Sequence, residues 1–285
     1  GGRVAAMSSF QRWAFGLTVP AALLTICLYV VPILQVLALS FTEPTFGFGN
    51  YVEMFGSAAI GRVVRTTMIV SAVTTVLTIV MSYAVAFALV HMRPAARRVA
   101  LFMVMVPFWV SVLVRAFAWI TILRRNGVLN SALVGSGAIA EPLELVYNQF
   151  GVIVGMVHYM MPFAILLLYT NLSEIDPRII QAARSLGARP VTIFTRVWLP
   201  LSLPGLAIAS LFIVIFSLGF LVTPAILGAG RVLMVAEYIS VQISSTLRWG
   251  VATALSTTLL LVVGVLVAVA ARSPALRAAF EGGRR

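Results

Sequence analysis

Six long apolar stretches constrain the fold of this 285-residue chain more than any other feature. A helix needs roughly 20 apolar residues to cross a bilayer core of about 30 Å, because lipid offers no hydrogen-bond partner to exposed backbone groups. We therefore expect an all-α integral membrane protein with six transmembrane helices, in one domain over residues 1–285. The predicted spans cover residues 13–41, 63–90, 99–123, 151–171, 201–227 and 251–271.

Proline or glycine interrupts several of these stretches. Neighbouring helices tolerate such residues in a membrane, where they commonly bend a span. The first stretch is too long for the core of a signal peptide, so we interpret it as a retained helix, with Met7 or an earlier residue as the natural start. We expect bends rather than breaks at Pro20, Pro32, Pro162, Gly219 and Pro224.

Composition excludes several classes of function. With 61% hydrophobic and 10% charged residues, the chain lies far outside the range of soluble domains. It contains no lysine, which a phosphate-binding P-loop and a Schiff base both require, and Cys27 has no second cysteine to pair with. His91 and His158 lie outside any cluster of metal-ligating residues. We expect a protein that is not an enzyme and binds no metal itself.

The formal net charge of +12 comes from arginines in short runs between the apolar stretches. This distribution favours membrane lipid over nucleic acid as a partner. Cytoplasmic loops carry the excess of positive charge, so both termini of this multi-pass membrane protein are expected in the cytoplasm. One set of loops carries Arg3, Arg12, Arg93, Arg97, Arg98, Arg178, Arg184, Arg189, Arg196, Arg272, Arg277, Arg284 and Arg285, and the opposite set only Arg62, Arg65, Arg124, Arg125, Arg231 and Arg248.

Three segments on the opposite side are longer than minimal turns. They cover residues 42–61, 124–150 and 228–250 and are expected to face the periplasm. Two interpretations stay open for them: a docking surface for another protein, or plain solvated loops.

A polar segment over residues 173–200 separates the fourth and fifth apolar stretches. Asp176 and Pro177 are typical of an N-cap and a first helical position, and Gly187 suits a helix end. A second short helix is predicted from Pro190 towards Trp198, stopped by Pro200. Two short helices joined at a glycine would form a compact knob suited to a groove on a partner protein. Its predicted apolar face comprises Ile179, Ile180, Ala183 and Leu186.

The same segment resembles the EAA loop of ABC importer permeases, which implies a type I ABC importer permease fold. The resemblance implies that Ala182 and Ala183 pack in the cleft of an ATP-binding subunit and that Gly187 permits the turn. Gln181 replaces the usual glutamate and Val197 the usual isoleucine, so an ion pair made by the glutamate is lost while packing is retained. The implied coupling residues are Gln181, Ala182, Ala183, Leu186, Gly187, Val197, Leu199 and Pro200.

The similarity is greatest to the spermidine/putrescine type of permease. It implies a place in the bacterial inner membrane, a second related permease subunit, a dimer of ATP-binding subunits that bind ATP and Mg, and a periplasmic solute-binding protein, while this chain binds no cofactor. The solute stays open among polyamines, amino-acid derivatives, phosphonates and iron. The matching segments cover residues 48–51, 107–109, 114–119, 147–148, 175–178 and 199–205.

One departure from that group concerns the solute. Phe220 stands where such permeases often carry an acidic residue before Thr223 and Pro224. The six predicted spans contain no carboxylate, whereas Arg115 places a positive charge in the third. This favours a solute with a carboxylate, phosphonate or zwitterionic group over a free polyamine, unless the partner permease supplies the acid.

Seven residues are candidates for the substrate pathway, each with a second interpretation. Arg115 either contacts substrate or makes a structural pairing, and His158 is either a proton relay or a packing residue. Thr223 either marks a gate or bonds a backbone carbonyl. The aromatic candidates, for which interfacial or core packing is the alternative, are Trp109, Trp119, Tyr159 and Phe220.

Two rival functions remain from the sequence. An ion- or proton-coupled secondary transporter normally needs intramembrane acids or broken-helix ion sites. A non-transporting membrane scaffold is the other. Solute flux that requires a separate ATPase would distinguish an ABC permease from both.

Overall fold

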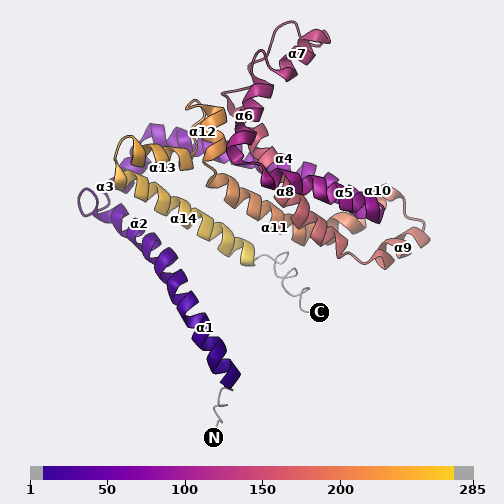
Figure 1. Ribbon diagram of the computed structural model, residues 1–285, viewed down its shortest axis with the longest axis horizontal. Helices are drawn as coiled ribbons and strands as arrows, with labels where there is room; N and C mark the ends of the chain where they lie inside the picture. The colour runs from indigo at the N-terminus through magenta and orange to yellow at the C-terminus, as the bar shows by residue number, and fades with distance from the viewer. Residues whose placement is uncertain (1–8, 273–285) are drawn as a thin grey trace. The chain divides into compact units, whose positions relative to one another are not determined.

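A computed structural model describes residues 9–272, which form helices joined by loops (Figure 1). Five helical segments are long and apolar enough to cross a membrane, and a bent pair of segments makes up to a sixth span. The predicted all-α membrane fold is confirmed. Met7 and the arginines at 3, 277, 284 and 285 lie outside the described residues. The five segments are Gly16–Thr42, Ala58–His91, Gln149–Ser173, Pro190–Leu218 and Trp249–Arg272.

The chain divides into two compact units, Gly1–Ser57 with Val241–Thr258 and Ala58–Ser240 with Leu259–Arg285. The helices of the first segment are α1 (Ser9–Thr25), α2 (Val31–Thr42) and α3 (Gly49–Gly56). Then follow α4 (Ala58–His91), α5 (Pro94–Met105), α6 (Val112–Leu123), α7 (Val128–Gly135), α8 (Gln149–Ser173), α9 (Pro177–Ser185), α10 (Pro190–Ile193), α11 (Leu199–Leu218) and α12 (Val222–Gly228). The last two helices are α13 (Val235–Ser244) and α14 (Trp249–Arg272).

Within the first unit, polar contacts fix the turn between α2 and α3. The buried Asn50 side chain donates hydrogen bonds to the backbone oxygens of Ser40 (3.0 Å) and Glu43 (2.6 Å). The Ser40 hydroxyl also lies 2.8 Å from the Tyr51 hydroxyl. These bonds satisfy carbonyls at the end of α2 that have no partner inside the helix.

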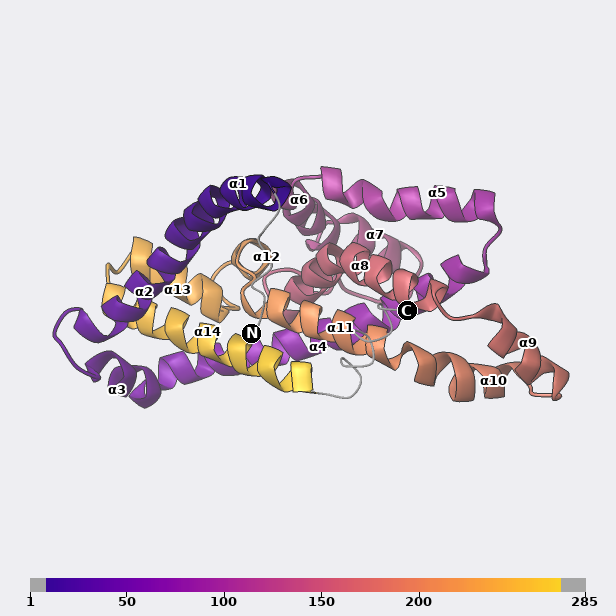
Figure 2. The same ribbon diagram turned by 90° about the horizontal axis from the view of Figure 1, so that it is seen from below.

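In the second unit, α4, α8 and α11 pack against one another as its central layer (Figures 1 and 2). A stripe of buried hydroxyl side chains runs along α4 at helical spacing. Small hydroxyl residues allow helix backbones to approach closely in a membrane, and the Ser82 hydroxyl is placed 3.4 Å from the Met161 carbonyl of α8. The stripe comprises Thr67, Ser71, Thr74, Thr75, Thr78 and Ser82.

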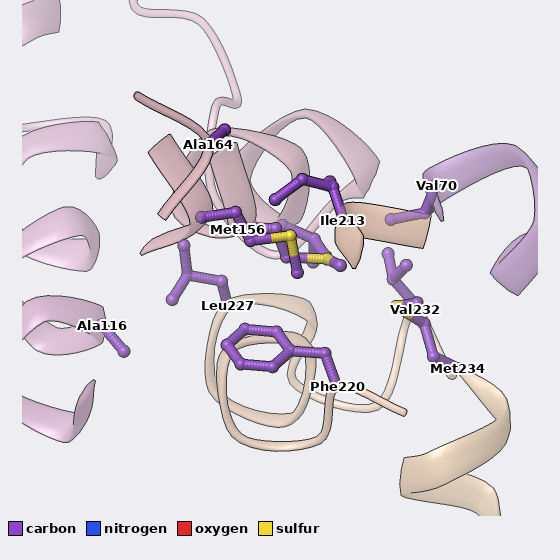
Figure 3. Packing of buried hydrophobic residues seen from close by; sticks show 11 residues of the cluster. Val70, Ala116, Met156, Ala164, Ile213, Phe220, Leu227, Val232 and Met234 are labelled. Atoms are coloured by element: carbon purple, nitrogen blue, oxygen red, sulfur yellow. The ribbon is translucent and has the colours of Figure 1, made fainter. Parts of the chain in front are cut away.

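A hydrophobic cluster around the middle of α8 forms the main core of this unit (Figure 3). Met156 of α8, Ile213 of α11 and Leu227 of α12 are fully buried there. Phe220, between α11 and α12, also belongs to this cluster. The core therefore holds α12 against the spanning helices.

Two π-helical turns lie just before prolines, at Ile26–Val30 ahead of Pro32 and at Phe194–Trp198 ahead of Pro200. Proline lacks an N–H and its ring crowds the carbonyl four residues back, so a widened turn lets the helix continue. Our prediction that Pro200 stops a short helix is wrong, because Pro190–Leu218 is one continuous segment.

The third predicted span is broken rather than continuous. Pro107 lies in a 3₁₀ turn (Val106–Trp109), after which Val110 and Ser111 take extended backbone conformations. The two arms, Pro94–Trp109 and Val112–Gly135, meet at 99°. The missing N–H of Pro107 weakens the helix there, and the two extended residues complete the break.

The fifth predicted span is also interrupted. It ends at Leu218 instead of residue 227, and α12 begins as a separate helix at Val222. Pro224 lies in the first turn of α12, where its missing N–H costs nothing. The expected bend at Gly219 is therefore a break, whereas Pro224 lies inside α12. At Pro20 and Pro162, by contrast, the helix continues as expected.

Candidate functional site

Helix α9 begins at a well-formed cap. The Asp176 carboxylate accepts a hydrogen bond from the Arg178 backbone N–H at 2.8 Å, and Pro177 is the first helical residue. Both residues act as predicted, because aspartate satisfies a free N–H at the helix start and proline needs none there.

The helix ends at Gly187 in a Schellman motif. The Gly187 N–H donates to the Arg184 carbonyl (2.9 Å) and the Ala188 N–H to the Ala183 carbonyl (3.1 Å). Gly187 has φ of +76°, a left-handed conformation that strains every residue with a Cβ atom. The open space around it means that its backbone conformation, and not crowding, requires glycine here.

The two sides of α9 have different surroundings. Ile180 is buried and Ala183 partly buried against the rest of the unit, as the predicted apolar face requires. Ile179 and Leu186 do not belong to that face, since they are 45% and 87% exposed. The predicted face is thus only half right: Ile180 and Ala183 pack against the unit, whereas Ile179 and Leu186 are exposed.

An exposed apolar tip results at the end of the knob. Leu186 and Val191 (73% exposed) project among three exposed arginines. Gln181 and Ala182 are exposed on the same helix. Figure 2 shows α9 and α10 together at one end of the unit. The arginines are Arg178, Arg184 and Arg189.

Aromatic side chains join this knob to α4. Phe87 of α4 contacts Phe194 (ring centroids 5.4 Å apart) and Trp198 (5.3 Å), both in the π turn ahead of α11. His91 also lies 5.3 Å from Trp198, and the Tyr83 hydroxyl is 2.9 Å from the Ser202 hydroxyl. Edge-to-face pairs of this kind stabilise beyond their buried area. We call this set of residues the aromatic joint.

The predicted coupling residues after Gly187 lie around the aromatic joint. Val197 and Leu199 are partly buried against it, while Pro200 is exposed in the first turn of α11. Ile180 and Ala183 of α9 pack on the same cluster. The inner side of the knob and the start of α11 therefore share one packed core.

Six of the seven pathway candidates lie together near the middle of α8. Arg115, Trp119, His158, Tyr159 and Thr223 line one small cavity. The Phe220 ring lies 4.8 Å from the Tyr159 ring, so it belongs to the same group. Trp109 does not: it is 70% exposed and its ring neighbour is Phe102.

Arg115 makes a cation–π contact inside this group. Its guanidinium carbon lies 4.5 Å from the centre of the Tyr159 ring, and its buried Nε has no hydrogen-bond partner in the structure. The cavity has room for about one water molecule. In this conformation the group is a packed cluster around a partly buried charge, too tight to hold a solute.

Three residues that the sequence did not single out line a larger groove, of about 360 Å³, between the end of α8 and the first half of α11. They are Asn171, Glu174 and Gly205. A Cβ atom on Gly205 would collide with the Asn171 side chain, so the glycine makes room for the amide. In the sequence, the signal that could have indicated this groove was Glu174, an acidic residue close to the end of a predicted span.

Within the described residues, no group of three or more His, Cys, Asp or Glu side chains could hold a metal ion. The expectation that cofactors bind elsewhere remains a prediction.

Residues 79–277 match the family described as binding-protein-dependent transport system inner membrane component. The chain belongs to this family. It is 31% identical over 248 residues to the spermidine/putrescine transport system permease protein PotB of Haemophilus influenzae, covering 84% of this chain and 86% of that protein. It is 28% identical to PotB of Escherichia coli K12, covering 81% and 83% respectively.

Among solved structures, the chain resembles a chain of a bacterial alginate ABC transporter in complex with an alginate pentasaccharide-bound periplasmic protein. The TM-score is 0.79 at 18% identity, over 91% of this chain and 94% of that one. This likeness confirms the fold of an ABC importer permease. The predicted family, an ABC permease subunit resembling the spermidine/putrescine type, is also confirmed.

Proposed function

We propose that this permease subunit imports a small polar solute of polyamine-like type, driven by ATP hydrolysed on separate subunits, with α9 as the coupling element. The observation that carries the proposal is the division of α9 into an exposed tip and a side packed on the aromatic joint. A coupling helix needs both, because it must contact a partner and move the spans.

The aromatic joint supplies a route for that motion. A shift of α9 acts on Ile180 and Ala183, which pack against the cluster containing Trp198 and Phe194. From there the contacts continue to Phe87 on α4 and through Ser202 to Tyr83. Binding of ATP by the partner drives the cycle only to the extent that it favours one arrangement of these elements over another.

The proposed assembly contains a second related permease, a pair of ATP-binding subunits that hold ATP and Mg, and a periplasmic solute-binding protein. Both termini and α9 lie on the cytoplasmic side in this proposal, as the arginine distribution favours. The family description supports the binding protein as a partner, and the names of the relatives support a polyamine-like solute.

Arg115 has a structural role in this proposal. Its pairing with Tyr159 in a cavity the size of one water supports packing over solute contact. The sequence argument against a free polyamine depended on the lack of carboxylates within the spans. Glu174 lies one residue beyond the end of α8, so its carboxylate was not among the span residues on which that argument depended.

Site-specific cross-linking tests the coupling role. In a Cys27→Ser background, Leu186→Cys should cross-link to the ATP-binding subunit, whereas the matched control Leu129→Cys on α7 should not. Uptake into proteoliposomes should require ATP and the solute-loaded binding protein. Solute flux without the ATP-binding subunits, or cross-linking from Leu129→Cys alone, would contradict the proposal.

A further inference from the structure

The groove between the end of α8 and the first half of α11 lies directly before α9, the proposed coupling element. Its volume is about 360 Å³, far larger than the cavity around Arg115. Leu166, Leu167 and Ile208 form apolar walls. A space of this size with apolar walls admits a short alkyl chain.

The polar groups of the groove offer hydrogen-bond acceptors. The Oδ1 atom of Asn171 is buried and has no hydrogen-bond partner in the structure. The Thr170 hydroxyl donates its own proton to the Leu166 carbonyl at 2.9 Å, so its oxygen is left to accept. Glu174 contributes a carboxylate that makes no ion pair with the described side chains of residues 16–272.

A buried acceptor without a donor is costly, and a carboxylate nearby favours a cation over a neutral donor. Among the residues that the structure describes, no arginine or histidine lines the groove, and the chain contains no lysine. An anionic solute group would meet the Glu174 carboxylate without any compensating positive charge. The chemistry that completes the site is an alkylammonium group: N–H donors and positive charge at Asn171 and Glu174, with methylene groups along the leucines.

We propose that this groove binds an ammonium group of the transported solute near the coupling loop. The inference rests on the proposed function, since it takes the ligand to be the solute on its way through the permease. In this inference the Glu174 carboxylate at the end of α8 selects the solute, and the cluster around Arg115 has a structural role. Gly205 is then a positioning residue, because it lets Asn171 lie in the groove.

The test uses the complete transporter in lipid nanodiscs without the binding protein, and radiolabelled putrescine as the probe, with succinate as the anionic counterpart. The wild type should bind putrescine and not succinate. Glu174→Gln should weaken putrescine binding about tenfold, which corresponds to losing one charge-assisted hydrogen bond. Glu174→Asp should restore most of it. The control Glu144→Gln, an exposed acid between α7 and α8, should leave binding unchanged.

A second measurement asks whether the groove is open in the assembly. In a Cys27→Ser background, Thr170→Cys should react faster with a cationic than with an anionic methanethiosulfonate, and putrescine should slow the cationic reaction. Lack of labelling would mean that lipid or the partner permease fills the groove and would overturn the inference, as would unchanged putrescine binding in Glu174→Gln.

The same preparations separate this inference from the proposed function. ATP hydrolysis stimulated by the solute-loaded binding protein tests only the importer assignment. A wild type that shows this stimulation while Glu174→Gln binds putrescine normally refutes the groove alone. A wild type without stimulation counts against the importer itself.

Discussion

The middle and the end of α8 bury polar groups in opposite ways. In the middle, Arg115 lies over Tyr159 in a closed cluster whose cavity holds about one water. At the end, Asn171 and Glu174 line an open groove of about 360 Å³ directly before α9. One helix thus combines a closed region built for packing with an open region that has room for a ligand and leads into α9.

This contrast separates structural from functional candidates more sharply than residue type does. From the sequence, charged and aromatic residues inside the spans are the candidates for substrate contact, yet in the structure such residues form the closed cluster. The open region is marked by an amide, an acid and a glycine. Substitutions should therefore affect stability in the closed region and transport in the open one.

The largest expected effect is on transport, at the open end. Gly187→Val should lower solute-stimulated ATP hydrolysis by about tenfold or more. A left-handed φ costs a residue with a Cβ roughly 1–2 kcal/mol, so the substitution should distort the turn after α9. Gly137→Val is the matched control, with φ of +73° and open surroundings in the loop after α7. Equal losses in both variants would show that strain alone, and not the coupling position, matters. Gly187→Asn should retain most activity.

The next effect is on stability, in the closed region. Gly155→Ala should lower the free energy of unfolding by about 1–3 kcal/mol, because the new Cβ would lie 2.7 Å from Thr223 Cγ2 and the surrounding side chains are buried. Gly264→Ala, with nothing within 4 Å of its Cβ, is the control and should be neutral or stabilising. Thermal unfolding in detergent measures both. A Gly155→Ala protein as stable as Gly264→Ala would show that the middle of α8 is not closed.

A smaller, pH-dependent effect is expected at Glu237 on α13, three residues after Met234 of the buried hydrophobic cluster. Burial raises the pKa of the Glu237 carboxyl, and its Oε2 has no hydrogen-bond partner in the structure. The folded state therefore favours the protonated acid. Its stabilisation is full below the ordinary pKa and is lost as pH rises through the raised one, with a slope of at most about 1.4 kcal/mol per pH unit.

Glu237→Gln should flatten this dependence and unfold at a higher temperature than the wild type near neutral pH. Glu141→Gln, an exposed acid, should leave the profile as it is. A wild type whose unfolding temperature rises with pH in this range, with Glu237→Gln unaltered, would show that the carboxylate has a partner.

The smallest effect is expected at the cap of α9. Asp176→Ala should destabilise this helix by about 1 kcal/mol, since it removes the acceptor for the Arg178 N–H. Hydrogen exchange of the α9 amides should become faster while exchange in the middle of α8 stays unchanged. Faster exchange in both regions would mean that the open end and the closed middle unfold together.

Local chemistry predicts the parts of this fold that depend on a few neighbouring residues. Asp176, Pro177 and Gly187 set the ends of α9 through short-range backbone rules, and those expectations hold. Pro107 and Gly219 are visible in the sequence as residues that weaken a helix, but the sequence does not distinguish a bend from a break at these points. An apolar stretch of sufficient length looks the same to a hydropathy pattern whether it crosses the membrane or turns back into the core.

The candidate sites show the same limit. The grouping of Arg115, His158 and Tyr159 follows from spans that the sequence located, although their tight packing does not. The groove at Asn171 depends on a contact between α8 and Gly205 of α11, 34 residues apart in number. Helix packing brings these residues together, and no spacing rule along one chain segment predicts it.

The π turn before Pro200 has a mechanical consequence. Because it lets the helix pass the proline, the 29 residues from Pro190 to Leu218 act as a single stiff lever, about 43 Å long at 1.5 Å per residue. A sideways shift of 2 Å at the loop end corresponds to a tilt of only about 3° over that length. The first break comes at Gly219, beside Phe220 in the sequence, so if α9 is the coupling element, as proposed, a tilt at its end would reach the hydrophobic cluster around Phe220.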